Sequence, residues 1–113
     1  RVHSMDIEPP SIEYERVTFY EGDSREINNT MLNIENLPHP WIILEDAHVE
    51  VNKVMTYFEK HMHVGDYMII EDTRGKKGST LEIPSTLHVD AYYCDYFGRN
   101  ATSSMNTILC KRY

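Results

Sequence analysis

Two pairs of acidic residues follow short apolar runs of the chain, and their residue types could bind a metal ion. Glu45-Asp46 ends the first run and Glu71-Asp72 ends the second. Several carboxylate oxygens without cysteine suit Mg²⁺ or a similar oxygen-preferring cation, and acids placed together repel one another unless a positive charge lies among them. Glu45, Glu71 and Asp72 are therefore the metal candidates, with Asp46 as a substitute. The alternative, that these acids are solvated or cap a following helix, stays open.

A histidine and three further polar residues also lie at or just after the ends of β-prone stretches. His48 follows the first acid pair, where it could act as a general base on a substrate hydroxyl or could only orient a carboxylate. Asp6 ends a short stretch before two prolines. Asp23 and Ser24 follow a β-prone run, and either one could serve as a helix N-cap.

The elements that would position these side chains form one βαβ unit. Apolar runs at 41–44 and 67–70 predict strands. Between them, apolar residues at 51, 54, 55, 58 and 62 have helical spacing, and Gly65 is expected to end that segment. A crossover of this length usually returns the chain in the same direction, so the two strands should be parallel. Their carboxyl ends, where open α/β sheets bind ligands, would then bring the acid pairs together.

The remaining segments complete an α/β sandwich with a mixed sheet. We expect strands at 1–7 and 16–20, a helix at 25–36, and an antiparallel β-hairpin made by 87–97 and 107–112 at the sheet edge. The 113 residues suffice for one small domain.

Composition excludes some partners and leaves others open. A net charge of −7 argues against a nucleic-acid partner, which requires a basic face. No apolar run approaches the roughly 20 residues needed to span a bilayer. The first residue is Arg1 rather than Met, so the chain is expected to be processed or incomplete. A cytoplasmic location is the default expectation, and assembly into a homo-oligomer stays open.

Three stretches resemble one family. They are His-Pro-Trp-Ile-Ile-Leu-Glu-Asp-Ala-His at 39–48, Gly-Asp-Tyr-Met-Ile-Ile-Glu-Asp-Thr at 65–73, and the residues at 96–102 and 109–112. The first two are similar to the fourth- and fifth-strand motifs, and the third to the C-terminal hairpin, of the cephalosporin hydroxylase and rhamnosyl O-methyltransferase group of S-adenosylmethionine-dependent methyltransferases. The resemblance extends over about Val2 to Arg112.

The resemblance implies a partial Rossmann-like methyltransferase fold, with a parallel sheet, a C-terminal antiparallel hairpin and the first strand missing. Asp6 would bind the ribose of S-adenosylmethionine, and Asp23 with Ser24 its adenine. Glu45, Glu71 and Asp72 would hold Mg²⁺ or a similar divalent cation, although Glu45 stands where the bacterial relatives have aspartate. The expected activity is O-methylation of a hydroxyl on a sugar or another small molecule.

Two departures from the family pattern support a different function. The family's first strand and glycine-rich cofactor turn have no counterpart here, and the segment between the fifth and sixth strands is short. The chain would then be a truncated methyltransferase-like domain at 1–113, or a non-catalytic remnant or partner subunit without a complete cofactor site. An iron oxygenase ranks last, because that chemistry usually requires two histidines beside a carboxylate and only His48 is placed near the acids.

Overall fold

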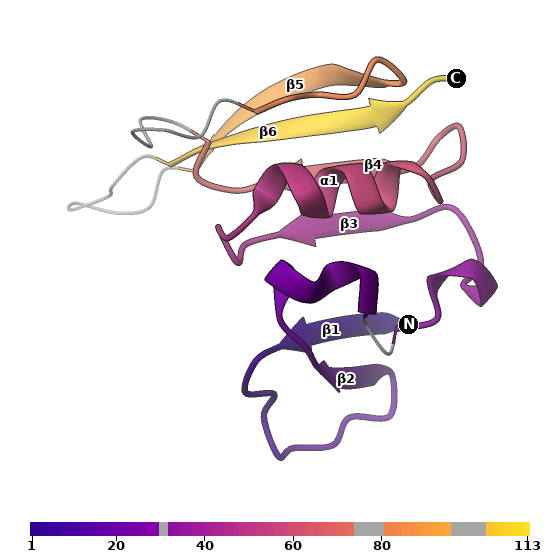
Figure 1. Cartoon of the computed structure of the whole chain (residues 1–113), viewed down its shortest axis with the longest axis vertical. Helices are drawn as coiled ribbons and strands as arrows, with labels where there is room; N and C mark the ends of the chain where they lie inside the picture. Colours follow the sequence, from indigo (N-terminus) through magenta and orange to yellow (C-terminus); the bar gives the residue numbers. More distant parts are fainter. Residues whose placement is uncertain (30–31, 74–80, 96–103) are drawn as a thin grey trace.

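The computed structural model describes residues 1–29, 32–73, 81–95 and 104–113. Within these ranges the chain forms six strands, one α-helix and two short 3₁₀ helices, in an α/β arrangement with two open sheets (Figure 1). The elements in chain order are β1 (Val2–Asp6), β2 (Val17–Glu21), η1 (Ser24–Asn29), η2 (Ile34–Asn36), β3 (Ile42–Glu45), α1 (Val51–Glu59), β4 (Tyr67–Ile70), β5 (Leu87–Asp95) and β6 (Ser104–Lys111).

Parallel and antiparallel pairs both occur. β1 and β2 form a two-stranded parallel sheet, in which Val2 pairs with Val17. The second sheet has the order β3-β4-β6-β5, with β3 parallel to β4 and the last three strands antiparallel. The predicted parallel βαβ unit and the edge hairpin are therefore confirmed. A bulge between Val89 and Ala91 interrupts the hairpin pairing.

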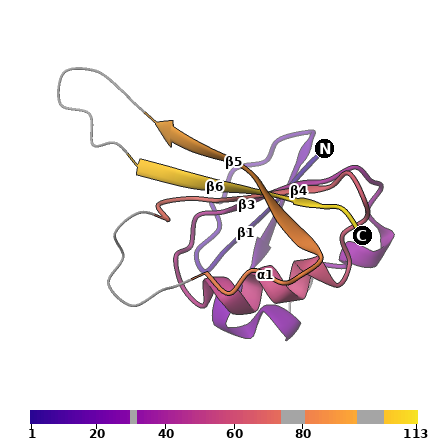
Figure 2. The same cartoon turned by 90° about the horizontal axis from the view of Figure 1, so that it is seen from above.

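Helix α1 covers one face of the four-stranded sheet, as Figure 2 shows. Its apolar side, including Val51, Met55 and Phe58, packs on the fully buried Met68 and Leu109 of the sheet. The helix ends at Glu59, earlier than the apolar spacing predicted, but the chain beyond it still places a buried methionine in the core. Gly65 has a φ of 95°, a conformation that favours glycine and turns the chain toward β4.

The opposite face of the same sheet is open. Ile42 and Leu44 alternate with the core-facing residues of β3 and are 79% and 58% exposed. β3 is also an edge strand, paired only with β4 among the described strands. Figure 1 places β1 as the strand of the smaller sheet nearest to this edge, and both arrows point the same way.

The helix predicted over 25–36 is wrong. The described part of this segment holds η1 and η2 instead, and the backbone of Glu26 is not helical. Asparagine, which occurs at 28, 29 and 33, has a low helix propensity because its side chain can hydrogen-bond to the nearby backbone in non-helical conformations. The apolar spacing nevertheless identified core residues, because Ile27 and Ile34 are both buried.

A buried polar cluster joins the end of α1 to the last strand. The ammonium group of Lys111 donates to the Glu59 carboxylate, to the Glu59 carbonyl oxygen at 3.0 Å and to the Thr86 hydroxyl at 3.1 Å. The Thr86 hydroxyl donates to the same carboxylate. These hydrogen bonds, that from Lys111 first and that from Thr86 second, hold the pKa of Glu59 below its usual value.

Acidification should therefore destabilise the fold partly through Glu59. A carboxyl group with a lower pKa in the folded chain contributes stability above its unfolded pKa, and this contribution is lost as pH falls through the folded pKa. We expect the free energy of unfolding in urea to fall as the pH drops below about 5, with a smaller fall in Glu59→Gln. Identical pH profiles of the two proteins would contradict this assignment.

Candidate functional site at the strand ends

The predicted acids gather at the carboxyl ends of β3 and β4. The two strands are parallel, and the backbone N–H of Glu71 continues their ladder by donating to the carbonyl oxygen of Glu45 at 3.0 Å. Asp46 and Asp72 follow within two residues of the strand ends. We call Glu45, Asp46, His48 and Asp72 the acid rim.

Glu45 is the buried member of the acid rim. It is 5% exposed, because its side chain lies on the sheet face that α1 covers. Its Oε1 accepts the backbone N–H of His48 at 3.0 Å, which shapes the turn after β3. Its Oε2 is buried and finds no hydrogen-bond partner in the described part of the chain. A buried carboxylate oxygen without a partner is costly, so this atom marks a place where a donor would be favourable.

The imidazole of His48 lies between two carboxylates. Its Nε2 is 3.2 Å from Asp46 Oδ1 and 3.3 Å from Asp72 Oδ2. Its Nδ1 is buried and makes no hydrogen bond to any described residue. The accessible nitrogen is thus occupied by the carboxylates, and this geometry favours the orienting role of His48. Its role as a general base stays a prediction.

Backbone strain is concentrated in the same place. His48, Glu50 and Asp72 have φ values of 57°, 53° and 51°, and they are the non-glycine residues with positive φ in the described chain. This left-handed conformation costs roughly 1–2 kcal/mol for a residue with a side chain. Strain of this kind persists where surrounding contacts enforce it, and it often accompanies functional sites. Here it turns the ring of His48 toward the carboxylate of Asp72.

The acid rim does not form a ready metal site. Across the described ranges, no three histidine, cysteine, aspartate or glutamate side chains are grouped so that they could hold a metal ion. One carboxylate oxygen of Glu45 already accepts the backbone N–H of His48 in the turn after β3. The backbone of Asp72 is held in place by its N–H, which donates to Asn106 Oδ1 at 3.1 Å. The structure thus brings the three predicted ligands to one edge without arranging them around one point. The Mg²⁺ assignment to Glu45, Glu71 and Asp72 stays a prediction.

The predicted cofactor residues lie at the ends of the other parallel pair. Asp6 ends β1, and its carboxylate accepts the backbone N–H of Glu8 at 2.9 Å. Asp23 accepts both the backbone N–H and the guanidinium of Arg25, with the shortest contact at 2.5 Å. The side-chain hydrogen bond from Arg25 lowers the pKa of Asp23. The Ser24 hydroxyl donates to the carbonyl oxygen of Val49 at 3.1 Å, which ties this turn to the loop after β3.

These contacts agree with a local capping or turn role for Asp6, Asp23 and Ser24, and the same residues could also bind a cofactor. Asp23 makes the local hydrogen bonds expected of a capping residue. Asp6 is exposed and makes a similar local turn. The ribose and adenine contacts of Asp6, Asp23 and Ser24 stay predictions.

Sequence reasoning missed a second polar cluster, at the opposite ends of β3 and β4. Asp66, immediately before β4, is fully buried. Its carboxylate accepts the backbone N–H groups of Trp41 and His63 at 2.8 and 2.7 Å, and lies 2.6 Å from Nδ1 of His39. The available signal was an aspartate directly before an apolar strand, in a chain where histidines precede both strands.

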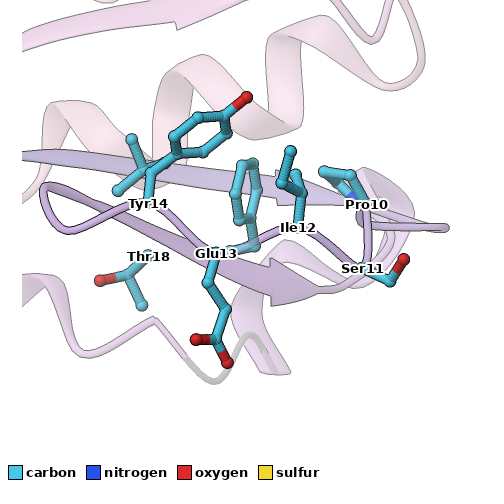
Figure 3. Close-up of a pocket in the computed structure, with 8 residues that line it drawn as sticks. Pro10, Ser11, Ile12, Glu13, Tyr14 and Thr18 are labelled. Atoms are coloured by element: carbon cyan, nitrogen blue, oxygen red, sulfur yellow. The ribbon is translucent and has the colours of Figure 1, made fainter.

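A shallow pocket also lies beside β2, and none of the predicted site residues lines it. It has a volume of about 460 Å³, and Figure 3 shows residues from the 10–14 segment around it. Its lining residues are Pro10, Ser11, Ile12, Glu13, Tyr14, Val17, Thr18 and Phe19. Ile12 and Tyr14 are 50% and 56% exposed, so this hollow is open to solvent.

The last observations concern membrane spans and similarity to known proteins. Within the ranges that the structure describes, no helix is both long and apolar enough to cross a membrane. Comparisons with protein-family models, with curated proteins and with solved structures find no match to this chain.

Proposed function

We propose that this chain is part of an S-adenosylmethionine-dependent O-methyltransferase domain that methylates a hydroxyl of a sugar or another small molecule. The observation that carries the proposal is the acid rim at the carboxyl ends of parallel strands, with His48 held between Asp46 and Asp72. Ligands of open α/β sheets bind at this edge. The resemblance at 39–48 and 65–73 supplies the reaction class.

The sheet arrangement supports a Rossmann-like fold that lacks one strand. Reading across both sheets gives β2, β1, a gap, and then β3, β4, β6 and β5. A methyltransferase sheet of the family has its first strand at the position of this gap. One additional parallel strand there would pair with the edges of β1 and β3 that no described strand occupies, and it would join the two sheets.

The charge of the acid rim suits the reactants. S-adenosylmethionine carries a positive sulfonium group, which a cluster of carboxylates attracts. In the transfer, the acceptor oxygen forms a bond to the methyl carbon while the carbon–sulfur bond breaks, which leaves S-adenosylhomocysteine and one proton. The exposed carboxylates of Asp46 and Asp72, with side chains 65% and 45% exposed, can accept the proton that the acceptor hydroxyl releases. Because the acids are not arranged around one point, we derive no step through a metal ion.

A non-catalytic remnant or partner subunit is the second candidate. The open edge of β3 and the separation into two sheets favour it, because a complete cofactor site needs a continuous sheet edge. In this candidate the acid rim would keep its geometry but would bind S-adenosylmethionine no better than other acidic surfaces of the chain.

Binding of labelled S-adenosylmethionine to the whole chain separates the two candidates. Saturable binding is expected, and Asp72→Asn should weaken it about threefold to fivefold, the effect of one partly exposed charge. Asparagine tolerates the left-handed backbone at this position, so the substitution removes charge without adding strain. Glu15→Gln, which neutralises an exposed acid between β1 and β2, is the matched control. Absent binding, or equal losses in both variants, would reject the catalytic candidate and favour the non-catalytic remnant or partner subunit.

A further inference from the structure

A pocket of about 340 Å³ lies at the end of the sheet opposite the acid rim. We call it the aromatic pocket, and its lining residues are Glu35, His39, Trp41, Lys60, His61 and His63. They come from η2, from the segment before β3 and from the turn after α1. The volume falls within the range of small-molecule sites, roughly 300–1,000 Å³, so the chemistry of the lining residues indicates which ligand would fit.

A buried carboxylate fixes one wall of this pocket. Asp66 accepts the backbone N–H of Trp41 at 2.8 Å and lies 2.6 Å from Nδ1 of His39, so it positions both residues. The indole N–H of Trp41 donates to the carbonyl oxygen of Pro38 at 3.0 Å. A wall whose side chains are held in place before a ligand arrives loses little conformational entropy on binding.

Three flat rings form this wall. The ring centroid of His39 lies 4.0 Å from that of Trp41 and 3.6 Å from that of His63, at interplanar angles of 19° and 14°. His63 is exposed, and no other aromatic ring of the described chain stacks on it. A planar group of a ligand can therefore extend the stack beyond His63, because stacked arrangements of aromatic rings are favourable.

Two opposite charges line the same pocket without neutralising each other. The side chains of Glu35 and Lys60 are exposed, and neither makes a hydrogen bond or an ion pair to a described residue. The carboxylate of Glu35 can accept hydrogen bonds from an ammonium group, and the ammonium group of Lys60 can donate to a carboxylate. The lining thus combines one negative group, one positive group and a flat wall.

We propose that the aromatic pocket binds an aromatic α-amino acid in its zwitterionic form. The ammonium group of the ligand lies at Glu35, its carboxylate lies at Lys60, and its ring stacks on His63. A ligand with a single charge leaves either Glu35 or Lys60 without a partner, so the zwitterion is the class that uses the whole lining. The site lies at the amino ends of β3 and β4, and the proposal does not depend on the methyltransferase function.

Trp41 provides a direct readout of this site, because it is the only tryptophan of the chain and lines the pocket. Titration of the whole chain with L-phenylalanine should change the fluorescence of Trp41 in a saturable manner. Phenylpropionate lacks the ammonium group and phenethylamine lacks the carboxylate, so each should bind about threefold to fivefold more weakly, the effect of one exposed charge. L-alanine, which lacks the ring, should also bind more weakly. A change that never saturates, or equal affinities for all four compounds, would overturn the proposal.

Charge-removing variants then assign the two ends of the ligand. Lys60→Gln should weaken binding of phenylalanine and phenylpropionate about threefold to fivefold and leave phenethylamine unchanged, whereas Glu35→Gln should weaken phenylalanine and phenethylamine and leave phenylpropionate unchanged. A general disturbance of the pocket would weaken all three ligands alike.

Two matched variants serve as controls. Lys53→Gln removes an exposed positive charge from α1, and Glu15→Gln removes an exposed negative charge between β1 and β2, and neither residue lines the pocket. Both should bind phenylalanine as the unmodified chain does. Losses in the controls as large as those in Lys60→Gln and Glu35→Gln, or the same loss for every ligand in the pocket variants, would reject the site.

Discussion

Replacement of Asp66 by alanine should lower the free energy of unfolding by about 3 kcal/mol or more. The fully buried carboxylate satisfies the amide N–H groups of Trp41 and His63 and the ring N–H of His39. Each buried donor left without an acceptor costs roughly 1–3 kcal/mol, and alanine offers no substitute. Urea denaturation, followed by circular dichroism, measures the loss.

Asp46→Ala is the matched control for this prediction. It removes the same side chain from the other end of β3, where the Asp46 side chain is 65% exposed and shares His48 with Asp72. Exposed pairs of this kind contribute about 1 kcal/mol or less. Losses of equal size in the two variants would show that Asp66 does not carry the proposed structural role.

Truncation of Leu109 to alanine should destabilise the fold by about 2–5 kcal/mol. Leu109 is fully buried in β6, where it pairs with Met68 on one side and Val89 on the other. Its removal leaves a cavity beneath α1, in the middle of the four-stranded sheet, so both the lost burial and the cavity contribute. The midpoint of urea denaturation reports the change.

Leu44→Ala makes the same chemical change at an exposed position. Leu44 is 58% exposed on the open face of β3, so its truncation should cost less than about 1 kcal/mol. A larger loss at Leu44 than at Leu109 would mean that the open face is the better packed one, contrary to the core described above.

The central unit could be predicted because its signals are local and agree with one another. Apolar runs that end on acids, helical spacing between them and Gly65 predict β3, α1 and β4, and the parallel pairing of the strands places Glu45 and Asp72 at the same edge of the sheet. The hairpin followed from its β-prone residues in the same way. The proximity of His48 to the acids also followed from chain position, although its contact with Asp72 depends on backbone strain that no sequence pattern reveals.

The rest depended on interactions distant in sequence. The segment after β2 has helical spacing of its apolar residues, but it forms the 3₁₀ helices η1 and η2, in keeping with the low helix propensity of its asparagines. The partners of Asp66 include His39, 27 residues away, so inspection of either residue alone suggests a surface position. The separation into two sheets could not be predicted from any local pattern, because such patterns do not show which strand edges are left unpaired. The family resemblance suggested it only through the expected absence of the first strand.

The short length of β3 and β4 gives the Asp66 contacts a wider consequence. Each strand has four residues, so few backbone hydrogen bonds oppose slippage of one strand along the other. A slip by one residue would turn Glu45 out to the open face and bring Leu44 under α1. Asp66 prevents this by holding the amide of Trp41, directly before β3. Asp66, at the amino ends of β3 and β4, thus keeps the strand register that buries Glu45 at the carboxyl ends, roughly 13 Å away.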